Sequence, residues 1–583
     1  MKTGRWAALG GLIGTAALLL AACGGTTSTS SQQAPLQKAN EMVAALPPQV
    51  GITNFAPVAN ALTLSVYNGG VNYMMYAPLV MVSSQDNIDQ ADSLAQSITP
   101  NSNDTAFTVK LKNWNFSNGT PITAQDIAFD ANLLMQACTM KNSPYSYGDC
   151  GFGGIPPVTG RAELTSVTAD NANTVTFKLS QPANPVWFEL NGLGQILAFP
   201  KAQWDKGSYM QDLQFLKSVA STPNASVYKV VSGPYKFSDM VTNQYWKFVP
   251  NTKYGGPAAT VTVVLQYEAS GAAEFAALRT NKINQGYLQP TEFGAAKQLK
   301  GYNQGLVSAF SWNGIQINSF KNQYVGNAFN DPAVRAALQY GIDEDAIGKL
   351  LFGTLNGKNL WVDQYSAIPT NFPALTKNVF GTSHIPVPYP YNPAQGMKVL
   401  ENDGYHMVNG VMTKGSTKLE FPVLYSSGSQ SATDAALVLK QDYAKEGIIV
   451  TLTSVPFDTQ IAMNNTQTPS NAPKWAFNWY GGWGYEPNYY PTGGGMWGYY
   501  QTVDSYSYAP FYKAVNNEYL PGSAAQAQKN MYAYAMATAK DLPVLWTPNG
   551  YGVSEAAPYL HGSNKWWNPV EYFTLWNHLT ISH

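Results

Sequence analysis

Residues 114–134 read WNFSNGTPITAQDIAFDANLL, and they predict a strand end, a tight turn and a capped helix in succession. The preceding residues 107–112 (FTVKLK) alternate apolar and polar, which is the period of a half-buried strand. Residues 117–121 (SNGTP) are turn formers, and Thr123 with Asp126 three residues later has the spacing of a capping box. The apolar residues that follow recur at helical spacing: Ile127, Ala131, Leu134, Met135 and Cys138. Nothing in this unit is chemically reactive, so these residues alone indicate no function.

The N-terminus has the features of an export signal. A positively charged start is followed by an apolar stretch at 7–22 that is shorter than the ~20 residues of a bilayer span. It ends in LAACG at 20–24, which resembles a bacterial lipobox, in which cleavage precedes Cys23 and its thiol is lipidated. We therefore predict a signal peptide over 1–22, and a lipidated cysteine with a flexible polar tether over 23–45. The alternative is an ordinary signal peptide with an incidental cysteine.

The composition excludes some classes of protein. The chain has 583 residues, of which 45% are hydrophobic, enough for two or three domains with substantial cores. Its formal net charge of −1 argues against nucleic-acid binding, which needs a basic surface. Charged residues make up only 12%, against about 25% in ordinary globular proteins. Because few carboxylates limit the change of charge when the pH falls, this composition favours an acidic exterior.

Two cysteines remain besides Cys23. Cys138 and Cys150 lie close together in the sequence, and such a pair outside the cytoplasm usually forms a disulfide. We predict that bridge, with two buried thiols as the alternative.

Motifs for catalysis and for metal binding are not found in the sequence. None of the five histidines forms HExxH, and no cysteine pair has C-x-x-C spacing. The chain also has no G-x-S-x-G elbow and no phosphate-binding loop. We therefore predict no cofactor, no metal and no enzymatic activity. A secreted glycosidase is the remaining enzyme alternative, since two suitably spaced carboxylates would suffice.

The unit at 114–134 resembles the signature of the bacterial extracellular solute-binding proteins of family 5. These are receptors for oligopeptide, dipeptide, nickel and some oligosaccharide ABC importers. Further family-like landmarks follow in the same order along the chain: 76–80 (YAPLV), 94–98 (LAQSI), 231–237 (VSGPYKF) and 330–343, which contains DPAVRAAL and ends in ID. The resemblance covers the chain from about residue 60 to its C-terminus.

The resemblance implies an α/β fold with two lobes, of the type II periplasmic-binding-protein kind, with an extra subdomain in lobe I and two crossing segments that form a hinge. Lobe I is then expected over 46–312, with the inserted subdomain at about 77–210, and lobe II over 313–545. The segment 546–583 is expected to return to lobe I. The crossings are expected at 311–318 and 541–548, both apolar and flanked by turn residues.

A β–α–β unit is predicted in lobe II from the residues themselves. Residues 419–425 and 447–452 have the composition of strands, and 432–446 has the period of an amphipathic helix. Spacing of this kind favours a parallel crossover.

The ligand site is expected in the cleft between the lobes. In peptide-binding relatives, a lobe II loop carries an aspartate for the ligand α-amino group. The matching segment here is 479–490, and it places Trp483 at that position, with Glu486 as a possible substitute. Glycines there allow close backbone approach to a ligand, and aromatic side chains offer flat faces, although some of them could belong to the core. The candidate ligand contacts are Asn68, Trp312, Asn313, Trp479, Tyr480, Gly481, Gly482, Trp483, Tyr485, Glu486, Trp497 and Trp546.

The resemblance therefore predicts a monomeric receptor that captures oligopeptides and delivers them to ABC permease subunits. It would be held at the cell membrane, on the periplasmic side or the outer face, through its lipid alone. An oligosaccharide ligand is the first alternative, because the amine-binding aspartate is missing. A sensory receptor or scaffold without a role in import is the other.

Overall fold

The computed structural model describes residues 41–156, 161–372, 386–465, 475–484, 497 and 509–582. The predicted signal peptide and the lipidation of Cys23 lie outside these residues. In the part of the chain that the structure describes, no helix is long and apolar enough to span a membrane.

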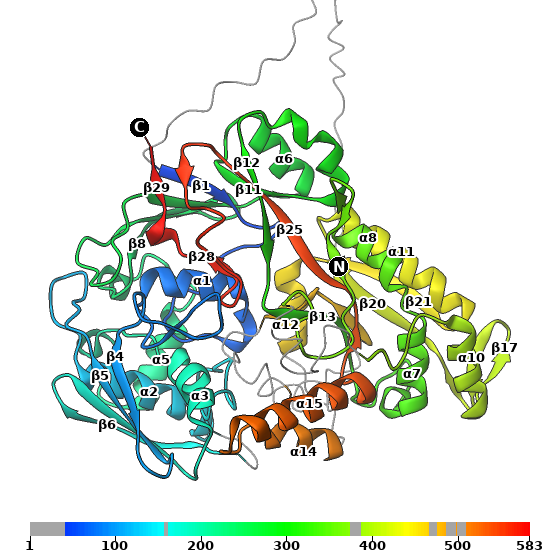
Figure 1. The fold of residues 1–583 in the computed structure, drawn as a ribbon, viewed down its shortest axis with the longest axis horizontal. Coiled ribbons are helices and arrows are strands. Elements are labelled where there is room, and N and C mark those ends of the chain that lie inside the picture. Colours follow the sequence, from blue (N-terminus) through cyan, green and yellow to red (C-terminus); the bar gives the residue numbers. More distant parts are fainter. Residues whose placement is uncertain are drawn as a thin grey trace, which may run out of the picture.

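Lobe I is built on an eight-stranded mixed sheet (Figure 1). Its strands run in the order β12 (Asn303–Ser308), β25 (Asn549–Ala556), β11 (Gln285–Leu288), β1 (Glu41–Ala45), β10 (Thr262–Gln266), β9 (Tyr245–Pro250) and β8 (Tyr235–Val241), and β16 (Trp361–Val362) pairs with β25. The prediction of a tether as far as residue 45 was wrong for its last five residues. They form β1, which lies parallel to β10 and β11, because Met42, Ala44 and Ala45 are buried in the core.

The inserted subdomain contains the strand, turn and helix predicted from 107–134. A four-stranded sheet has the order β4 (Ala95–Pro100), β5 (Ala106–Leu111), β7 (Thr174–Leu179) and β6 (Leu164–Asn171), and it packs against α2 (Ala124–Thr139). The capping box is confirmed: the backbone N–H of Thr123 donates to the Asp126 carboxylate at 2.9 Å, and the Thr123 hydroxyl accepts from the Asp126 N–H at 3.4 Å. Cys138 and Cys150 form the predicted disulfide, with 5.6 Å between their Cα atoms.

Lobe II is built on a six-stranded sheet, on the right in Figure 1. Its order is β21 (Ile449–Val455), β20 (Glu420–Ser426), β22 (Phe477–Trp479), β13 (Ser311–Ile317) and β23 (Gly482–Gly484), with β24 (Leu545–Trp546) also paired to β13. The predicted β–α–β unit is confirmed, because β20 and β21 are parallel and α11 (Gln430–Lys445) connects them.

Two short crossings that lie side by side connect the central sheets of the two lobes, and the chain also reaches the lobe I sheet at β16, within the span expected for lobe II. The first connects β12 in lobe I to β13 in lobe II, and the second connects β24 in lobe II to β25 in lobe I. β13 and β24 pair antiparallel, and the Asn549 side-chain amide donates to the Ser311 carbonyl at 2.8 Å. The crossings therefore form one hydrogen-bonded hinge.

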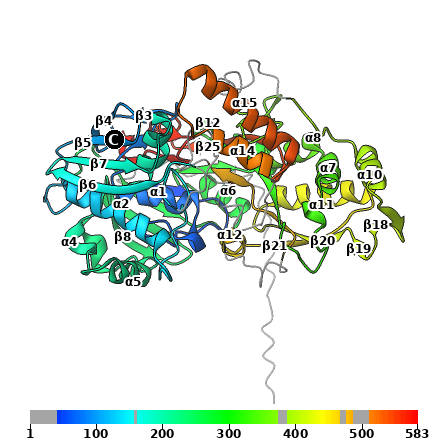
Figure 2. The same cartoon turned by 90° about the horizontal axis from the view of Figure 1, so that it is seen from below.

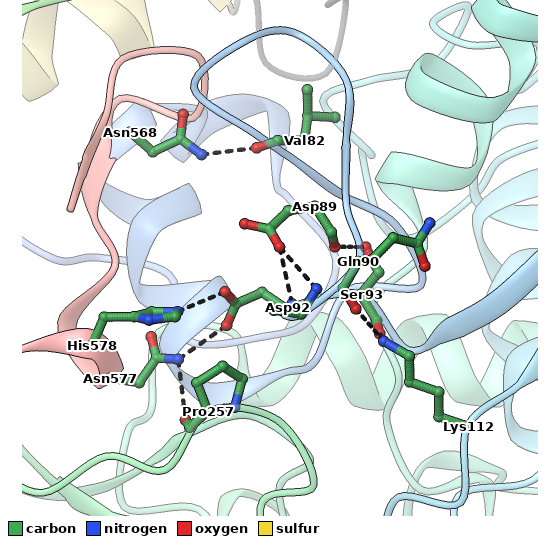
Figure 3. Close-up of polar contacts among 11 residues, drawn as sticks. Val82, Asp89, Gln90, Asp92, Ser93, Lys112, Pro257, Asn568, Asn577 and His578 are labelled. Atoms are coloured by element: carbon green, nitrogen blue, oxygen red, sulfur yellow. Dashed lines mark hydrogen bonds and ion pairs between the residues drawn. The ribbon is translucent and has the colours of Figure 1, made fainter. Parts of the chain in front are cut away.

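After the second crossing the chain packs on lobe I (Figure 3). The Asp92 carboxylate accepts a hydrogen bond from the Asn577 side chain at 3.0 Å, and its other oxygen lies 2.7 Å from His578 Nε2. The Asn568 amide donates to the Val82 carbonyl at 2.8 Å. These contacts hold the C-terminal residues to the start of the inserted subdomain.

Helices α14 (Ala509–Asn517) and α15 (Ala524–Asp541) lie between the inserted subdomain and lobe II (Figures 1 and 2). Tyr519, which lies between them, packs edge-on against Trp187 of the subdomain, with 4.9 Å between ring centroids. Its carbonyl accepts from the Asn184 N–H at 3.1 Å, and the Arg161 guanidinium lies 4.6 Å from its ring centroid. This segment falls within the expected span of lobe II, yet its buried residues belong to the core of lobe I.

Candidate functional site

Two adjoining cavities lie where the lobes meet. The first, about 220 Å³, is enclosed by α1 (Val66–Met75) and residues 147–149 of lobe I and by residues 480–484 of lobe II, and we call it the cleft cavity. The second, about 330 Å³, lies between α1, β11 and β25, and we call it the hinge cavity. Both are bordered by the same five residues: Val66, Tyr67, Ser311, Asn313 and Tyr572. The rings of Tyr67 and Tyr572 meet at 6.1 Å between centroids.

Helix α1 is held in place by Asn68, one of the predicted contact residues. The helix begins after Ser65, whose hydroxyl accepts from the Asn68 N–H. The Asn68 side-chain oxygen accepts from the backbone N–H groups of Thr53 and Asn54, at 2.9 and 3.2 Å, and its amide donates to the Thr63 carbonyl at 2.6 Å. Asn68 lines the cleft cavity, and these bonds use its side chain to hold the preceding loop against the helix.

The lobe II wall depends on two glycines. Gly481 adopts a φ of 112°, which favours glycine. At Gly482 a Cβ atom would lie 1.8 Å from the Trp312 carbonyl oxygen, since β13 pairs there with β23. The glycines were expected to let the backbone approach a ligand closely. At Gly482 the backbone instead lies close to strand β13. Tyr480 and Trp483 beside them are half-buried and line the cleft cavity.

Four of the predicted aromatic contacts are packed in the interior. Trp312 stacks on Trp497 with ring centroids 5.9 Å apart and meets Trp546 edge-on at 5.5 Å, and all three are at most 1% exposed. Trp479 is buried in the core of lobe II. None of the four is among the described residues that line either cavity. Their rings fill the space around the hinge strands, so we remove them from the set of candidate ligand contacts.

The remaining predicted residues fall into two groups. Asn68, Asn313, Tyr480, Gly481, Gly482 and Trp483 line the cleft cavity. Tyr485 and Glu486 lie outside the described residues.

Sequence reasoning missed several residues that line the cleft cavity: Asn54, Tyr67, Asn72, Tyr73, Asp149, Phe457 and Tyr572. Tyr67, Asn72 and Tyr73 belong to α1, a helix rich in apolar residues. Such a composition is typical of a helix buried in the core, so it does not indicate a ligand site. Asp149 was not among the predicted residues, although it directly precedes Cys150. The acidic side chain next to a disulfide was the one signal that could have identified it.

Each cavity contains one carboxyl group among its described lining residues, and neither contains a Lys, Arg or His among them. In the cleft cavity burial raises the pKa of Asp149 to about 7, although a hydrogen bond from the Tyr147 side chain acts in the opposite direction. In the hinge cavity burial raises the pKa of Glu274 well above its usual range. The described lining of the cleft cavity thus does not supply the two carboxyl groups that glycoside hydrolysis requires. Nor do the described residues contain a cluster of metal-ligating side chains.

The lobes touch each other across the cleft. The Ser427 hydroxyl of lobe II donates to the Gln49 side-chain oxygen of lobe I at 2.6 Å. The rings of Tyr67 and Phe457 meet edge-on at 6.0 Å between centroids. The structure is therefore a closed arrangement of the two lobes.

Comparison with known proteins places these features in a family. Residues 91–501 match the family model of bacterial extracellular solute-binding proteins, family 5 Middle. A Brucella ovis protein, named as peptide-binding for an ABC transporter, is 25% identical over 372 residues; the match spans 61% of this chain and 59% of that relative. The oligopeptide-binding protein AppA of Bacillus subtilis is 24% identical over 475 residues, spanning 79% of this chain and 77% of AppA.

Solved structures show the same fold. The structure of Bacillus subtilis AppA in complex with a nonapeptide superimposes with a TM-score of 0.74 at 20% identity, over 94% of this chain and 100% of that one. Helicobacter pylori DppA in complex with the peptide STSA superimposes with a TM-score of 0.71 at 18% identity, over 93% and 98% of the two chains.

Proposed function

This chain belongs to the bacterial extracellular solute-binding proteins of family 5, and from that premise we propose that it captures oligopeptides between its lobes and delivers them to the permease of an ABC importer. The observation that carries the proposal is the cleft cavity. Its walls come from both lobes, and its floor includes Ser311 and Asn313 beside the first crossing. A solute bound there touches both lobes and the hinge together.

Capture depends on a ligand making more contacts with the closed lobes than with the open ones. A ligand that bridges α1 and residues 480–484 gains its full set of contacts only when the lobes are closed, so it shifts the population toward the closed state. The Ser427–Gln49 hydrogen bond adds to that state without ligand. Two short crossings let the lobes rotate while they keep their register. The closed shape is the form that the permease subunits would accept.

Oligopeptide is the leading ligand class because the relatives named above include oligopeptide-binding and peptide-bound proteins. The cavity walls suit such a ligand, since tyrosine and tryptophan rings accept varied apolar side chains. Neutral oligosaccharide is the second candidate. The half-buried rings of Tyr480 and Trp483, both on the lobe II wall, are the observation that favours it.

We also propose that the chain is exported, lipidated at Cys23 and anchored to the cell membrane by that lipid. The lipobox-like sequence at 20–24 and the extracellular family support this. The receptor would act as a monomer beside its permease.

Mass spectrometry of the solute that co-purifies with the mature protein, made without Cys23 and released by denaturation, tests the ligand class. A ladder of peptide masses is expected. Hexose-spaced masses would instead assign the protein to oligosaccharide uptake. Should nothing co-purify, calorimetric titration with peptide and oligosaccharide libraries decides, and binding of neither would refute the proposal.

Two tyrosine variants locate the site in the same assay. Tyr480→Ala removes a ring from the cleft wall and is expected to lower the amount of bound solute. Tyr532→Ala is the matched control, because Tyr532 is 44% exposed on α15 and does not line either cavity among the described residues.

A further inference from the structure

The hinge cavity adjoins the proposed ligand site. Five residues border both cavities, and two of them, Tyr67 and Tyr572, have ring centroids 6.1 Å apart where the cavities meet. The hinge cavity, at about 330 Å³, is the larger of the two. A side chain of a ligand held in the cleft cavity therefore has this second space directly beside it.

Aromatic rings form much of the wall of the hinge cavity. The half-buried rings that line it include Tyr287, Phe293, Phe352, Tyr551 and Trp567. Because they are not fully buried, these rings keep surface that a ligand can cover. Polar atoms of two of them are used within the protein: the Trp567 indole N–H donates to the Ser308 carbonyl at 2.6 Å, and the Tyr551 hydroxyl donates to the Asn371 carbonyl at 3.2 Å. These two residues therefore present mainly the apolar part of their rings.

The wall has little to offer a charged group. Among the described residues that line the hinge cavity there is no Lys, Arg, His or Asp, and the one carboxyl group is that of Glu274. Its Oε1 atom accepts from the Tyr287 N–H at 2.5 Å, and burial raises its pKa well above the usual range, which favours the uncharged form. A charged side chain in this cavity would lose its hydration without gaining an ion pair. An apolar side chain would instead gain the free energy of leaving water.

The hinge cavity has walls from both lobes. Asn313 lies beside the first crossing and Gly550 beside the second, and both line the cavity. The ring of Phe352 packs on Gly550, where a Cβ atom would lie 2.5 Å from it. Leu351, the last residue of α8 (Glu344–Leu351), packs against the core of lobe II. An apolar group that fills the cavity therefore contacts lobe I, lobe II and the hinge together, and so favours the closed arrangement.

We propose that the hinge cavity binds a bulky apolar side chain, aromatic or branched aliphatic, of the ligand whose backbone lies in the cleft cavity. The protein would then select peptides that carry at least one such residue over peptides of small or charged residues. This inference rests on the proposed function, because it names the class of peptide that the receptor prefers.

The test uses five pentapeptide libraries whose background contains only Gly, Ala and Ser. One library has no guest residue, and the others carry a single Leu, Phe, Lys or Glu at each position in turn. Competition binding to the mature protein, read by native mass spectrometry, gives relative affinities. Wild type is expected to bind the Leu and Phe libraries about tenfold to hundredfold more tightly than the library without a guest. The Lys and Glu libraries should show no such gain.

Variants of Phe293 assign the preference to the hinge cavity, because this residue lines the hinge cavity and is not among the described residues that line the cleft cavity. Phe293→Glu places a carboxylate at a half-buried position of the wall. It is expected to abolish the gain from Leu and Phe and to create a gain from Lys. Phe293→Ala adds no charge and should lose most of the gain, so it provides the same test if the glutamate variant does not fold.

Phe275→Glu is the matched control. Phe275 lies on α6 (Gly271–Arg279), is also half-buried and packs on the same apolar cluster as Phe293. It does not line either cavity among the described residues. This variant should keep the wild-type preference, and circular dichroism checks that each variant is folded.

The outcomes separate the inference from the proposed function. If wild type gains nothing from a Leu or Phe guest, the inference is refuted and peptide capture stands. If folded Phe293 variants keep the full gain, the apolar side chain is bound elsewhere and the inference is likewise refuted. If wild type binds none of the libraries, peptide capture itself fails, and the inference fails with it.

Discussion

Glu446 provides a direct measure of how pH affects the stability of this protein. It caps the C-terminal end of α11 and is fully buried, and neither of its carboxyl oxygens has a hydrogen-bond partner among the residues that the structure describes. Gly341 and Gly396 pack so closely that a Cβ atom on either would lie within 2.6 Å of the carboxyl group. Burial, with a smaller contribution from Asp442, raises its pKa from 4.5 to about 9. Glu446 is therefore protonated in the folded protein at neutral pH.

The sign and size of the effect follow from linkage. The pKa of Glu446 is higher in the folded protein than in the unfolded chain. Its contribution to the free energy of unfolding is therefore fully present below pH 4.5 and is lost as the pH rises toward about 9. Between pH 4.5 and pH 7 the unfolded chain releases this proton and the folded chain keeps it. At about 1.4 kcal/mol per pH unit, that interval lowers the free energy of unfolding by about 3 kcal/mol. Glu446→Gln removes this contribution, since glutamine does not ionise.

Urea denaturation of the wild type and the Glu446→Gln variant at pH 4.5 and pH 7 measures the difference. The free energy of unfolding of the variant relative to wild type should increase by about 3 kcal/mol between the two pH values. Other buried carboxyl groups are common to both proteins and cancel in the comparison. Glu420→Gln, at an exposed position on neighbouring β20, is the control and should show no such change. An equal difference at both pH values would refute the reasoning.

Three further perturbations test the hinge, the disulfide and the cleft. Gly482→Ala should weaken peptide binding more than tenfold in calorimetry, because its Cβ would lie 1.8 Å from a carbonyl oxygen of β13; an unchanged Kd would contradict this. Replacing Cys138 and Cys150 by alanine should lower the free energy of unfolding in urea by about 3 kcal/mol for a loop of this length, and a loss below about 0.5 kcal/mol would show that the bridge does not constrain the unfolded chain. Gln49→Ala removes the hydrogen bond from Ser427 across the cleft and should weaken ligand binding about fivefold. Ser427→Ala should do the same, and the double variant should bind no worse than either single one; additive losses would mean that the two residues act separately.

The order of the elements could be predicted from short stretches of the chain. The capping box at Thr123, the alternation in β5 and the β20–α11–β21 unit each depend on residues a few positions apart, and the structure has all three. Periodicity and capping depend on residues close together in the sequence, so they can be recognised without knowledge of the fold. The limit of such reasoning appears at β1, where a short run of ordinary residues becomes a central strand because β10 and β11 flank it.

The site depended on the tertiary structure. Trp312 and Trp483 are directly opposed on paired strands, yet Trp312 is buried among Trp497 and Trp546, and Trp483 faces the cleft cavity. Which ring is buried depends on segments distant in sequence that pack together, and composition does not encode this. Asp149 likewise lines the cleft cavity only because the loop at 147–149 meets α1 and residues 480–484 there. The sequence by itself determined the capped helix α2, strand β5, the β20–α11–β21 unit and the family of this protein, since these follow from local patterns. The assembled lobes decided which side chains line the cavity between them, because that cavity is formed by segments far apart in the sequence.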